Sequence, residues 1–431
     1  MKIDFFKRFR DQFTSFKSFN LFDTQARRLI SSGHFENPEN IKKPEKHDNI
    51  RPAHKLKSLL FVTGIFPDIL HGGGLRIYDF ITALNERNVN VDLFTGAGAQ
   101  YSKNIIPSYK RRLRRLKIAA NEDFNSRELE TFIGRKKYDY IIVVWPWTAS
   151  IISPKLSKKN KIIFDFIECT TKRTMQDILM GRITIKKVKF FLETLLWELK
   201  ACSIAKGLIF ATSEDKLFAK KYLKVIQKST VVSSYISSNF SKLKNKCVEK
   251  SNSVCFIGNY DHYPNIDAIE WYIKKIHINV LKAIPTYKFY IIGSVNLNSK
   301  RLDRLLSKYK NFSNSIIYVG FVKEANEELA KYQIAVSPLI SGAGFRGKLI
   351  QYSILSKPIV ATSLSCAGLP LKHGGNILIA DDPKSFSDNV VALLKDKPLQ
   401  KKISKNAYDL VSSKYTWQSN IDRIISELSS I

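Results

Sequence analysis

The sequence predicts an α/β protein with two domains, each built around a parallel sheet. Two observations support this fold class. Short apolar runs typical of buried strands alternate with stretches of helical periodicity over most of the chain. Glycine-rich loops directly follow two of these runs, at Gly72–Gly74 and at Gly342–Gly347. Because open α/β sheets bind ligands at the carboxyl ends of their strands, these two loops mark the expected site.

The chain has 431 residues, which is enough for two separate hydrophobic cores. We expect a basic N-terminal extension and linker at 1–57, a first domain at 58–245, a second domain at 246–414 and a C-terminal helix at 415–431. The linker is polar and contains several prolines, which indicates extended or irregular backbone.

The composition argues against several kinds of site. The five cysteines are scattered and the seven histidines form no ligand pattern, so neither a disulfide framework nor a zinc site is indicated. Asp381 and Asp382 resemble a metal-binding pair, but they stand in a turn where helix capping is expected. No apolar run approaches the roughly 20 residues that span a bilayer, and no signal peptide is recognisable. We therefore predict no metal site and only peripheral membrane contact.

The formal net charge of +32 favours anionic partners. At the N-terminus, phenylalanines at helical spacing alternate with lysine and arginine, as in an amphipathic helix on a membrane surface. A helix docked on the protein's own surface would show the same pattern. A second basic run, Lys110–Lys117, is either another contact for anions or a solvated face. Since no motif supports nucleic acid, an anionic membrane surface is the expected partner.

The first domain opens with a strand, a loop, a helix and a second strand. The strands are KSLLFVTG and VNVDLFTG. The helix between them is predicted to bury Leu75, Tyr78, Ile81 and Leu84. Gly73 and Gly74 stand at the start of this helix, where backbone N–H groups can approach an anion. A structural glycine turn is the alternative.

Further elements extend this domain. YDYIIVVWPW and KIIFDFIECT are each typical of a strand followed by a loop, and a helix at about 185–204 precedes the strand GLIFAT. Asp165 and Glu168 lie in the second of these segments, where a carboxylate can receive a proton from a substrate hydroxyl or orient a substrate. A helix cap, or an ion pair with Lys172 or Arg173, would equally explain them.

The second domain contains the strand IAVSPL, the second glycine loop, a helix at about 348–355 and the strand PIVAT. Arg346 and Lys348 add positive charge at the start of that helix, whose dipole favours phosphate. A tight turn with two solvated cations is the alternative. Upstream, FIGNYDHYPNIDAIEWYIKKI predicts a strand, a loop containing Gly258, and a helix for which Asn265 is the simplest N-cap.

These motifs resemble the donor-binding half of retaining glycosyltransferases of the GT-B fold, especially family 4 (glycosyl transferases group 1). The resemblance covers most of residues 250–420. It rests on the PN-x-DA-x-x-W helix start, the G-x-G-x-R-x-K loop, the PIVAT strand and the segment LSCAGLPLKHGGNILIADDP, in that order. It implies two Rossmann-like domains facing a cleft, with the acceptor on the first, the donor on the second, and the C-terminal helix returning to the first.

The resemblance also implies roles for individual residues. Arg346 and Lys348 would neutralise the departing nucleoside diphosphate, and Asp165 and Glu168 match the family's pair of carboxylates. The implied donor-binding positions are Gly73, Gly74, Gly258, Gly320, Phe321, Val322, Gly342, Ala343, Gly344, Phe345 and Gln351. The nucleotide-sugar is a substrate, so no cofactor is expected.

Two positions depart from the family pattern. Many members carry two glutamates where this chain has Ala343 and Gln351. Gln351 can still hydrogen-bond a ribose hydroxyl, whereas Ala343 offers only its backbone. Activity remains the expectation, because relatives without the first glutamate share the R-x-K pattern and the leaving group is stabilised mainly by cations and N–H groups.

The sequence thus predicts a retaining, metal-independent, hexosyltransferase-like enzyme that moves a sugar from a nucleotide-sugar to a glycan hydroxyl. The expected acceptor is a lipid-linked or cell-surface polysaccharide. The expected location is the cytoplasm, with the protein peripheral at the cytoplasmic face of the membrane. Ala343 leaves one alternative open, a GT-B subunit without catalysis that serves as a binding or scaffolding partner of another transferase.

Overall fold

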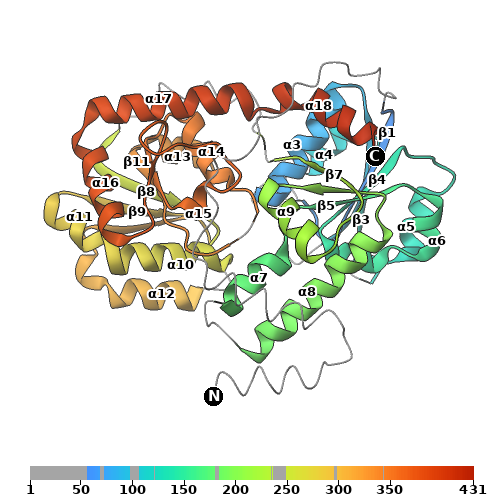
Figure 1. Ribbon diagram of the computed structural model, residues 1–431, viewed down its shortest axis with the longest axis horizontal. Helices are drawn as coiled ribbons and strands as arrows, with labels where there is room; N and C mark the ends of the chain where they lie inside the picture. The colour runs from blue at the N-terminus through green and yellow to red at the C-terminus, as the bar shows by residue number, and fades with distance from the viewer. Residues whose placement is uncertain are drawn as a thin grey trace. The chain divides into compact units, whose positions relative to one another are not determined.

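A computed structural model describes residues 56–67, 72–97, 106–120, 122–179, 184–233, 235, 249–295, 299–342 and 344–431. The predicted N-terminal amphipathic helix and Ala343 lie outside the described residues. Within the described part, the chain forms two parallel sheets that are each flanked by helices (Figure 1). This arrangement confirms the predicted α/β fold class.

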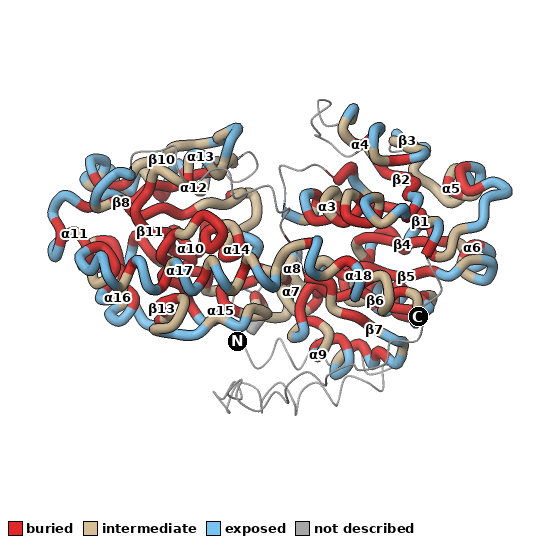
Figure 2. The backbone as a smooth tube through the Cα atoms, turned by 90° about the horizontal axis from the view of Figure 1, so that it is seen from above, coloured by how far each residue is buried: buried red, intermediate tan, exposed pale blue. Residues whose placement is uncertain are grey.

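The first sheet has seven parallel strands in the order β3-β2-β1-β4-β5-β6-β7. Its inner strands are almost wholly buried, as Figure 2 shows for β1, β4 and β5, which explains why they appear in the sequence as continuous apolar runs. The strands are β1 (Ser58–Thr63), β2 (Asn90–Gly96), β3 (Arg115–Ala119), β4 (Tyr140–Val144), β5 (Ile162–Phe166), β6 (Gly207–Phe210) and β7 (Lys228–Val231).

Helices connect these strands, and the long helix predicted at 185–204 is confirmed. The elements are α3 (Gly72–Glu86), α4 (Ile106–Arg112), α5 (Ser126–Ile133), η3 (Pro146–Ile151), α6 (Pro154–Lys159), α7 (Thr170–Leu179), α8 (Ile185–Ile204) and α9 (Ser213–Tyr222). The basic run at 110–117 is divided between α4 and β3, and Lys117 forms an ion pair with Glu128.

The buried face of α3 differs from the predicted stripe. Ile81 and Leu84 are buried as expected, but Leu75 is 38% exposed. The buried face instead includes Phe80, whose ring centre lies 5.7 Å from that of Phe61 in β1. The prediction was wrong in the first turn because the aromatic partners of this helix come from distant parts of the chain.

The second sheet has six parallel strands in the order β10-β9-β8-β11-β12-β13. They are β8 (Lys250–Ile257), β9 (Lys288–Ile292), β10 (Ile316–Gly320), β11 (Tyr332–Ser337), β12 (Ile359–Ala361) and β13 (Leu378–Ile379). The helical elements are α10 (Tyr263–Tyr272), η5 (Ile273–His277), α11 (Ile278–Ala283), α12 (Ser299–Lys308), η6 (Lys310–Phe312), α13 (Ala325–Ala330), α14 (Gly347–Ile354), α15 (Ser363–Cys366), α16 (Pro383–Lys395), α17 (Lys397–Lys414) and α18 (Trp417–Ser429).

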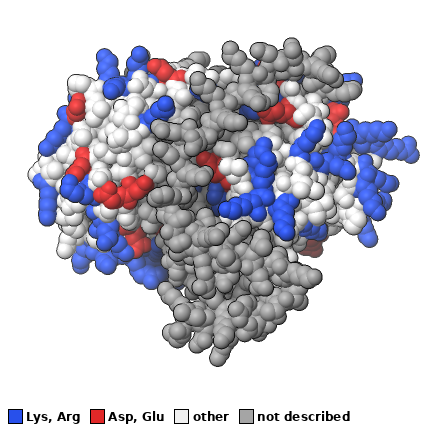
Figure 3. Space-filling model, in the orientation of Figure 1, with Lys and Arg blue, Asp and Glu red and all other residues white. Residues whose placement is uncertain are grey.

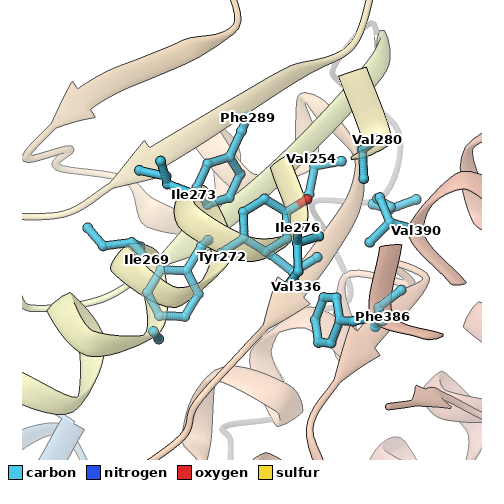
Figure 4. Packing of buried hydrophobic residues seen from close by; sticks show 14 of the residues in the cluster. Val254, Ile269, Tyr272, Ile273, Ile276, Val280, Phe289, Val336, Phe386 and Val390 are labelled. Atoms are coloured by element: carbon cyan, nitrogen blue, oxygen red, sulfur yellow. The ribbon is translucent and has the colours of Figure 1, made fainter. Parts of the chain in front are cut away.

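The core of the second domain lies between β8, β9 and β11 and the helices α10 and α16. Figure 4 shows Tyr272 between the strand residues and Phe386 of α16. The ring centre of Tyr272 lies 4.3 Å from that of Phe289 in β9, and 6.0 Å from that of Phe386. This packing positions the ends of β8 and β11, which carry the residues of the site.

The C-terminal helix α18 packs on the first domain, as predicted. Its buried residues Trp417, Ile421, Ile424 and Leu428 belong to the same hydrophobic cluster as β1 and α3. The Trp417 ring stacks on Phe80 with 5.1 Å between ring centres. The chain thus crosses back to the first domain after α17. Among the described residues, no helix is long and apolar enough to span a bilayer.

Candidate active site at the carboxyl edge of the second sheet

The predicted donor residues gather where the strand order of the second sheet reverses. β8 lies between β9 and β11, so the connections leaving β8 and β11 run to opposite sides of the sheet. The first helical turn of α10 follows β8, and the glycine loop with the start of α14 follows β11. Such a reversal point opens a crevice at the carboxyl ends of the strands, where α/β proteins bind nucleotides.

Lys348 links the two helices across this reversal point. Its Nζ donates to Asn265 Oδ1 at 2.7 Å and lies 4.0 Å from the centre of the Phe256 ring. Burial, and then the charge of Arg346, lower the pKa of Lys348 well below its usual value. A neighbouring anion favours the charged form of a lysine, so a bound phosphate would oppose this shift.

The predicted N-cap role of Asn265 is wrong. α10 begins at Tyr263, one turn earlier than expected, with His262 at the N-cap position. Pro264 fits in the first turn because it needs no hydrogen-bond acceptor there. Asn265 therefore lies within the helix, where its Nδ2 donates to the carbonyl of Asn259 at 2.7 Å and its Oδ1 accepts from Lys348.

Arg346 is the second cation of the site and is only 7% exposed. Its Nη1 donates to the carbonyl oxygen of Gly344 at 3.0 Å, which folds the side chain back over its own loop. Burial lowers the pKa of Arg346, and the carboxylates of Asp215, Glu168 and Glu214 in the first domain partly oppose this effect. The guanidinium thus faces the first domain across the domain interface.

Gly342 and Gly344 need to be glycines. Their φ angles are +123° and +76°, which residues with a Cβ rarely adopt. A Cβ on Gly344 would lie 3.0 Å from the Cβ of Glu168, and one on Gly342 would lie 3.2 Å from Arg346 Nη2. The loop can therefore pack closely both on its own arginine and on the first domain.

The remaining second-domain candidates lie around the same edge. Gln351 Nε2 donates to Asn326 Oδ1 at 2.7 Å. Gly320 ends β10, and Phe321 beside it is 58% exposed, with Val322 following. Phe345 packs against Tyr415 with 6.2 Å between ring centres, which connects the loop to the start of the C-terminal helix.

Gly258 has a packing role that its sequence context did not reveal. A Cβ at this position would lie 2.8 Å from the Asn265 side chain. A Cβ on Gly293 would in turn lie 1.8 Å from the Gly258 carbonyl oxygen. The ends of β8 and β9 and the start of α10 can therefore approach one another only with glycine at both positions.

Asp165 is fully buried and is paired with Arg76, not with either of the cations considered from the sequence. Arg76 Nη1 lies 2.5 Å from Asp165 Oδ2, and its Nη2 donates to the carbonyl of Val232 at 2.8 Å. Burial raises the pKa of Asp165 and the charge of Arg76 opposes that increase. This pair joins α3, β5 and the segment after β7.

Glu168 follows the alternative interpretation, an ion pair with Arg173. The Nε and Nη2 atoms of Arg173 each lie 3.0 Å from Glu168 Oε1. The guanidinium of Arg173 also lies 5.6 Å from the ring centre of Tyr263, the first residue of α10. Lys187 Nζ lies 5.7 Å from the centre of the same ring. An aromatic ring of the second domain is thus held by two cations of the first.

Sequence reasoning missed this contact. Burial, together with Arg173, Lys348 and Arg346, lowers the pKa of His262 to about 3, so three cations from two domains converge on the start of α10. The clustered charge is a physical sign of an anion site. Only the positions of Arg346 and Lys348 could be anticipated, because Arg173 lies far away in the sequence.

The two domains touch directly at the glycine loop. Gly342 N–H donates to Gln176 Oε1 of α7 at 3.4 Å, and Gly368 N–H donates to Glu214 Oε1 of α9 at 2.9 Å. On the first-domain side, a Cβ on Gly73 would lie 3.5 Å from both Ile167 and Trp145. Gly74, beside it at the start of α3, is buried.

Within the described residues, no group of three or more His, Cys, Asp or Glu side chains is arranged to hold a metal ion. The acidic pair at 381–382 has structural roles. Asp382 caps α16 by accepting from the N–H of Ser385, as predicted, and Asp381 accepts from the N–H and hydroxyl of Ser363.

The comparisons with known proteins agree with this geometry. A family model described as Glycosyl transferases group 1 matches residues 251–396, the segment that carries Lys348, Arg346 and the glycine loop. This part of the chain is therefore similar to the glycosyl transferases group 1 family. The chain is also similar to an uncharacterized 44.6 kDa protein in the cps region of Klebsiella pneumoniae, at 26% identity over 372 residues, covering 80% of this chain and 92% of that protein.

Solved structures show the same fold at low sequence identity. Sucrose-phosphate synthase from Thermosynechococcus elongatus superposes with a TM-score of 0.64 at 12% identity, over 87% of this chain and 99% of that one. HepE from Anabaena, in complex with UDP and glucose, gives a TM-score of 0.62 at 13% identity, over 88% of this chain and 100% of that one. The chain therefore has the GT-B fold over both of its domains.

Proposed function

We propose that this glycosyltransferase moves a sugar from a UDP-sugar to a hydroxyl of a glycan, with retention at the anomeric carbon. The observation that carries the proposal is the Lys348–Asn265 contact across the reversal point of the second sheet, with buried Arg346 beside it. Both cations have neutral hydrogen-bond partners, an amide oxygen and a backbone carbonyl. A diphosphate would accept charge-assisted hydrogen bonds from both cations and would favour the charged form of Lys348, whose pKa burial lowers.

The chemistry follows from where negative charge develops. As the bond between sugar and diphosphate breaks, charge accumulates on the leaving phosphate oxygens. Preorganised cations and N–H groups stabilise that charge more than they stabilise the bound donor, and this difference lowers the barrier. Arg346, Lys348 and the N–H groups of the glycine loop are the groups in this position.

The nucleoside would lie along the edge towards β10. HepE was solved with UDP, which supports uracil as the first base to test. Phe321 is exposed at the end of β10 and can cover one face of a base, while Gln351, already aligned by Asn326, can turn its amide to ribose. Neither contact changes as the sugar leaves, so both would act mainly on donor affinity.

The proposed acceptor is a polysaccharide or its lipid-linked precursor. The Klebsiella relative comes from a cps region, which supports polysaccharide assembly as the context. We place the enzyme at the cytoplasmic face of the membrane, because the basic and aromatic N-terminal segment is suited to anionic headgroups. Glu168, at the domain interface and 22% exposed in its side chain, is the first-domain carboxylate that an acceptor hydroxyl can approach.

A thermal-shift panel of UDP, GDP, ADP and uridine tests the donor class. A ligand that binds only the folded state raises the melting temperature with its concentration. We expect a shift with UDP and little with uridine, and the loss of the UDP shift in Arg346→Ala. No shift with any nucleoside diphosphate would reject the proposal.

Ala343 favours one second candidate, a subunit that binds donor without turning it over. Incubation of the enzyme with UDP-glucose and related donors, followed by measurement of UDP release, distinguishes the two. UDP release that disappears in Arg346→Ala supports a transferase. UDP binding without release from any donor, in the presence of membrane lipid extracts as acceptors, supports the binding subunit.

A further inference from the structure

A basic groove lies at the opposite end of the first domain from the site. It has a volume of about 920 Å³ and is formed at the amino ends of β1, β4 and β5, by the end of α5, the loop after it, and α6. Figure 3 shows Lys and Arg side chains gathered on the right-hand end of the molecule, where α5 and α6 lie. Because substrates of parallel sheets bind at the carboxyl ends of strands, this groove is separate from the donor site.

The lining of the groove is strongly cationic. Seven of its 17 residues are lysine or arginine and only two are acidic, whereas the whole chain has 70 lysines and arginines among 431 residues. All seven cations are exposed. They are Lys57, Arg135, Lys136, Lys137, Lys155, Lys159 and Lys161.

Both acidic residues of the groove already have partners. Glu130 Oε2 pairs with Lys155 Nζ at 3.0 Å, and its other oxygen accepts from the Ser153 hydroxyl. Asp139 accepts the backbone N–H groups of Lys57 and Ser58 at 2.6 and 2.9 Å. Two carboxylates against seven cations leave the described lining of the groove with a net positive charge.

Most of the cations are not held by the protein. Lys136 pairs with Asp92, and Lys161 lies over the ring of Tyr140. In the part of the chain that the structure describes, Arg135, Lys137 and Lys159 take part in no ion pair. Helix dipoles favour a lysine at the end of α6, where Lys159 lies, but they do not explain cations on the loop or before β1.

The lining also indicates which kind of anion fits. Small-molecule sites are lined mainly by apolar groups, but the apolar residues here, such as Leu56, Ile133 and Leu156, are buried beneath the charges. The exposed large apolar residues that a membrane contact would need lie elsewhere, for example Leu196 and Leu199 on α8. No exposed aromatic ring lines the groove to stack a nucleobase.

The chain's own N-terminal segment is a poor occupant. Residues 1–55 contain 12 lysines and arginines and seven aspartates and glutamates, so their charge has the same sign as that of the groove. The occupant that fits the lining of the groove is therefore a soluble polymer. It carries negative charges at intervals, with hydroxyls rather than apolar groups between them.

We propose that this groove binds an acidic glycan chain, as a second carbohydrate site outside the donor cleft. The paired cations, Lys136 and Lys155, shape its walls, and Arg135, Lys137 and Lys159 contact carboxylates of the chain. Such a site would hold an acidic polysaccharide on the enzyme independently of turnover. It does not depend on the identity of the donor sugar.

Polygalacturonate, an acidic glycan, is the probe, and dextran is the neutral control. Affinity is measured by fluorescence anisotropy at 50 and 200 mM NaCl with the full chain. The test variant is Lys137→Glu/Lys159→Glu. The matched control is Lys401→Glu/Lys402→Glu, which makes the same charge change on exposed residues of α17 in the second domain. UDP binding and the melting temperature are measured for each protein, so that folding and the donor site are monitored separately.

We expect wild type to bind polygalacturonate and not dextran, with affinity falling steeply between the two salt concentrations because bound counterions are released. The groove variant should lose at least tenfold in affinity and the control less than threefold, with UDP binding unchanged in both. Equal losses in the two variants, or no loss in the groove variant, would overturn the proposal. A groove variant that keeps polygalacturonate binding but loses binding to phosphatidylglycerol vesicles would assign the groove to a membrane and also overturn it.

Discussion

The carboxyl edges of the two sheets have a similar strand order but different arrangements of charge. At the second sheet, half-buried Lys348 donates to an amide oxygen, and buried Arg346 donates to a backbone carbonyl with carboxylates of the first domain nearby. At the first sheet, three buried or half-buried carboxylates each face a cation: Asp165 with Arg76, Glu168 with Arg173, and Asp215 with Lys172.

This difference separates binding groups from structural groups. A buried ion pair has little capacity left for a ligand, and its removal leaves an uncompensated charge in the protein. A buried cation with a neutral partner has a lowered pKa and gains most when an anion arrives. The comparison therefore supports the proposal that the donor diphosphate binds at the second domain, while the ion pairs of the first domain mainly stabilise their own edge of the sheet.

The largest expected effect is on stability, from breaking the fully buried pair. Asp165→Asn leaves the Arg76 charge without its partner, and we expect unfolding free energy to fall by about 3–5 kcal/mol. Urea denaturation measures this loss. The control is Asp422→Asn, which removes an exposed pair with Arg87 and should cost less than about 1 kcal/mol. Equal losses in the two variants would contradict the structural role of Asp165.

The next effect is on turnover. Arg346→Ala should raise the barrier by about 3 kcal/mol, which is a loss of about 100-fold in kcat, while the melting temperature changes little. The steady-state rate of UDP release measures it. Arg111→Ala, on the exposed surface of α4, is the matched control and should keep wild-type kcat. Wild-type turnover in Arg346→Ala would show that Arg346 does not stabilise the leaving group.

The third prediction concerns a buried carboxyl without a cation. Glu198 of α8 accepts from the Thr171 N–H at 3.2 Å, and burial raises its pKa from 4.5 to about 7. The folded state therefore binds a proton that the unfolded state releases, and the resulting stability is complete below pH 4.5 and is lost as the pH rises through 7. The loss amounts to about 3 kcal/mol.

Glu198→Gln keeps the acceptor oxygen but cannot ionise, so its stability should fall less than that of wild type between pH 5.5 and 8; the fall that remains comes from Asp79, whose pKa burial also raises to about 7. Urea denaturation at both pH values provides the comparison with wild type. Glu193→Gln, on the exposed face of the same helix, should retain the wild-type pH dependence. If Glu198→Gln lost stability with pH as wild type does, another group would be responsible.

The sequence predicted the second domain better than the first, for a physical reason. Its binding residues are local: the glycines, Arg346 and Lys348 lie within seven consecutive positions, so their spacing alone places them on one loop and helix start. The inner strands of both sheets were predictable because buried parallel strands are continuous apolar runs, whereas β3 and β7, which are polar and partly exposed, were not predicted.

Long-range pairs were not predictable. Arg76 and Asp165 are separated by 89 positions, and nothing local distinguishes this arginine from a surface cation. The predicted start of α10 was also wrong. Asparagine is a common N-cap residue, but the Asn265 side chain lies within the helix and accepts a hydrogen bond from Lys348. Contacts between Arg173 and Tyr263 depend on how two domains meet, which no single-segment pattern contains.

The smallest expected effect is at the ribose. Gln351→Ala removes one neutral hydrogen bond that is present in both the bound donor and the transition state, so we expect about 1 kcal/mol, or about fivefold, in KM. The value of kcat should remain near that of wild type. Initial-rate kinetics over a range of donor concentrations separate the two parameters. A defect confined to kcat would place Gln351 at the reacting centre.

The most direct test of the central claim is a thermodynamic cycle in which either the diphosphate of the ligand or the Lys348 cation of the protein is removed. Isothermal titration calorimetry gives the affinities of UDP and uridine for wild type and for Lys348→Ala. We predict that wild type prefers UDP by about 2 kcal/mol or more, since each charge-assisted bond contributes about 1.5–3 kcal/mol, and that Lys348→Ala loses most of this preference while its uridine affinity is unchanged. An undiminished preference for UDP in Lys348→Ala would contradict the assignment of the diphosphate to the second domain's cations.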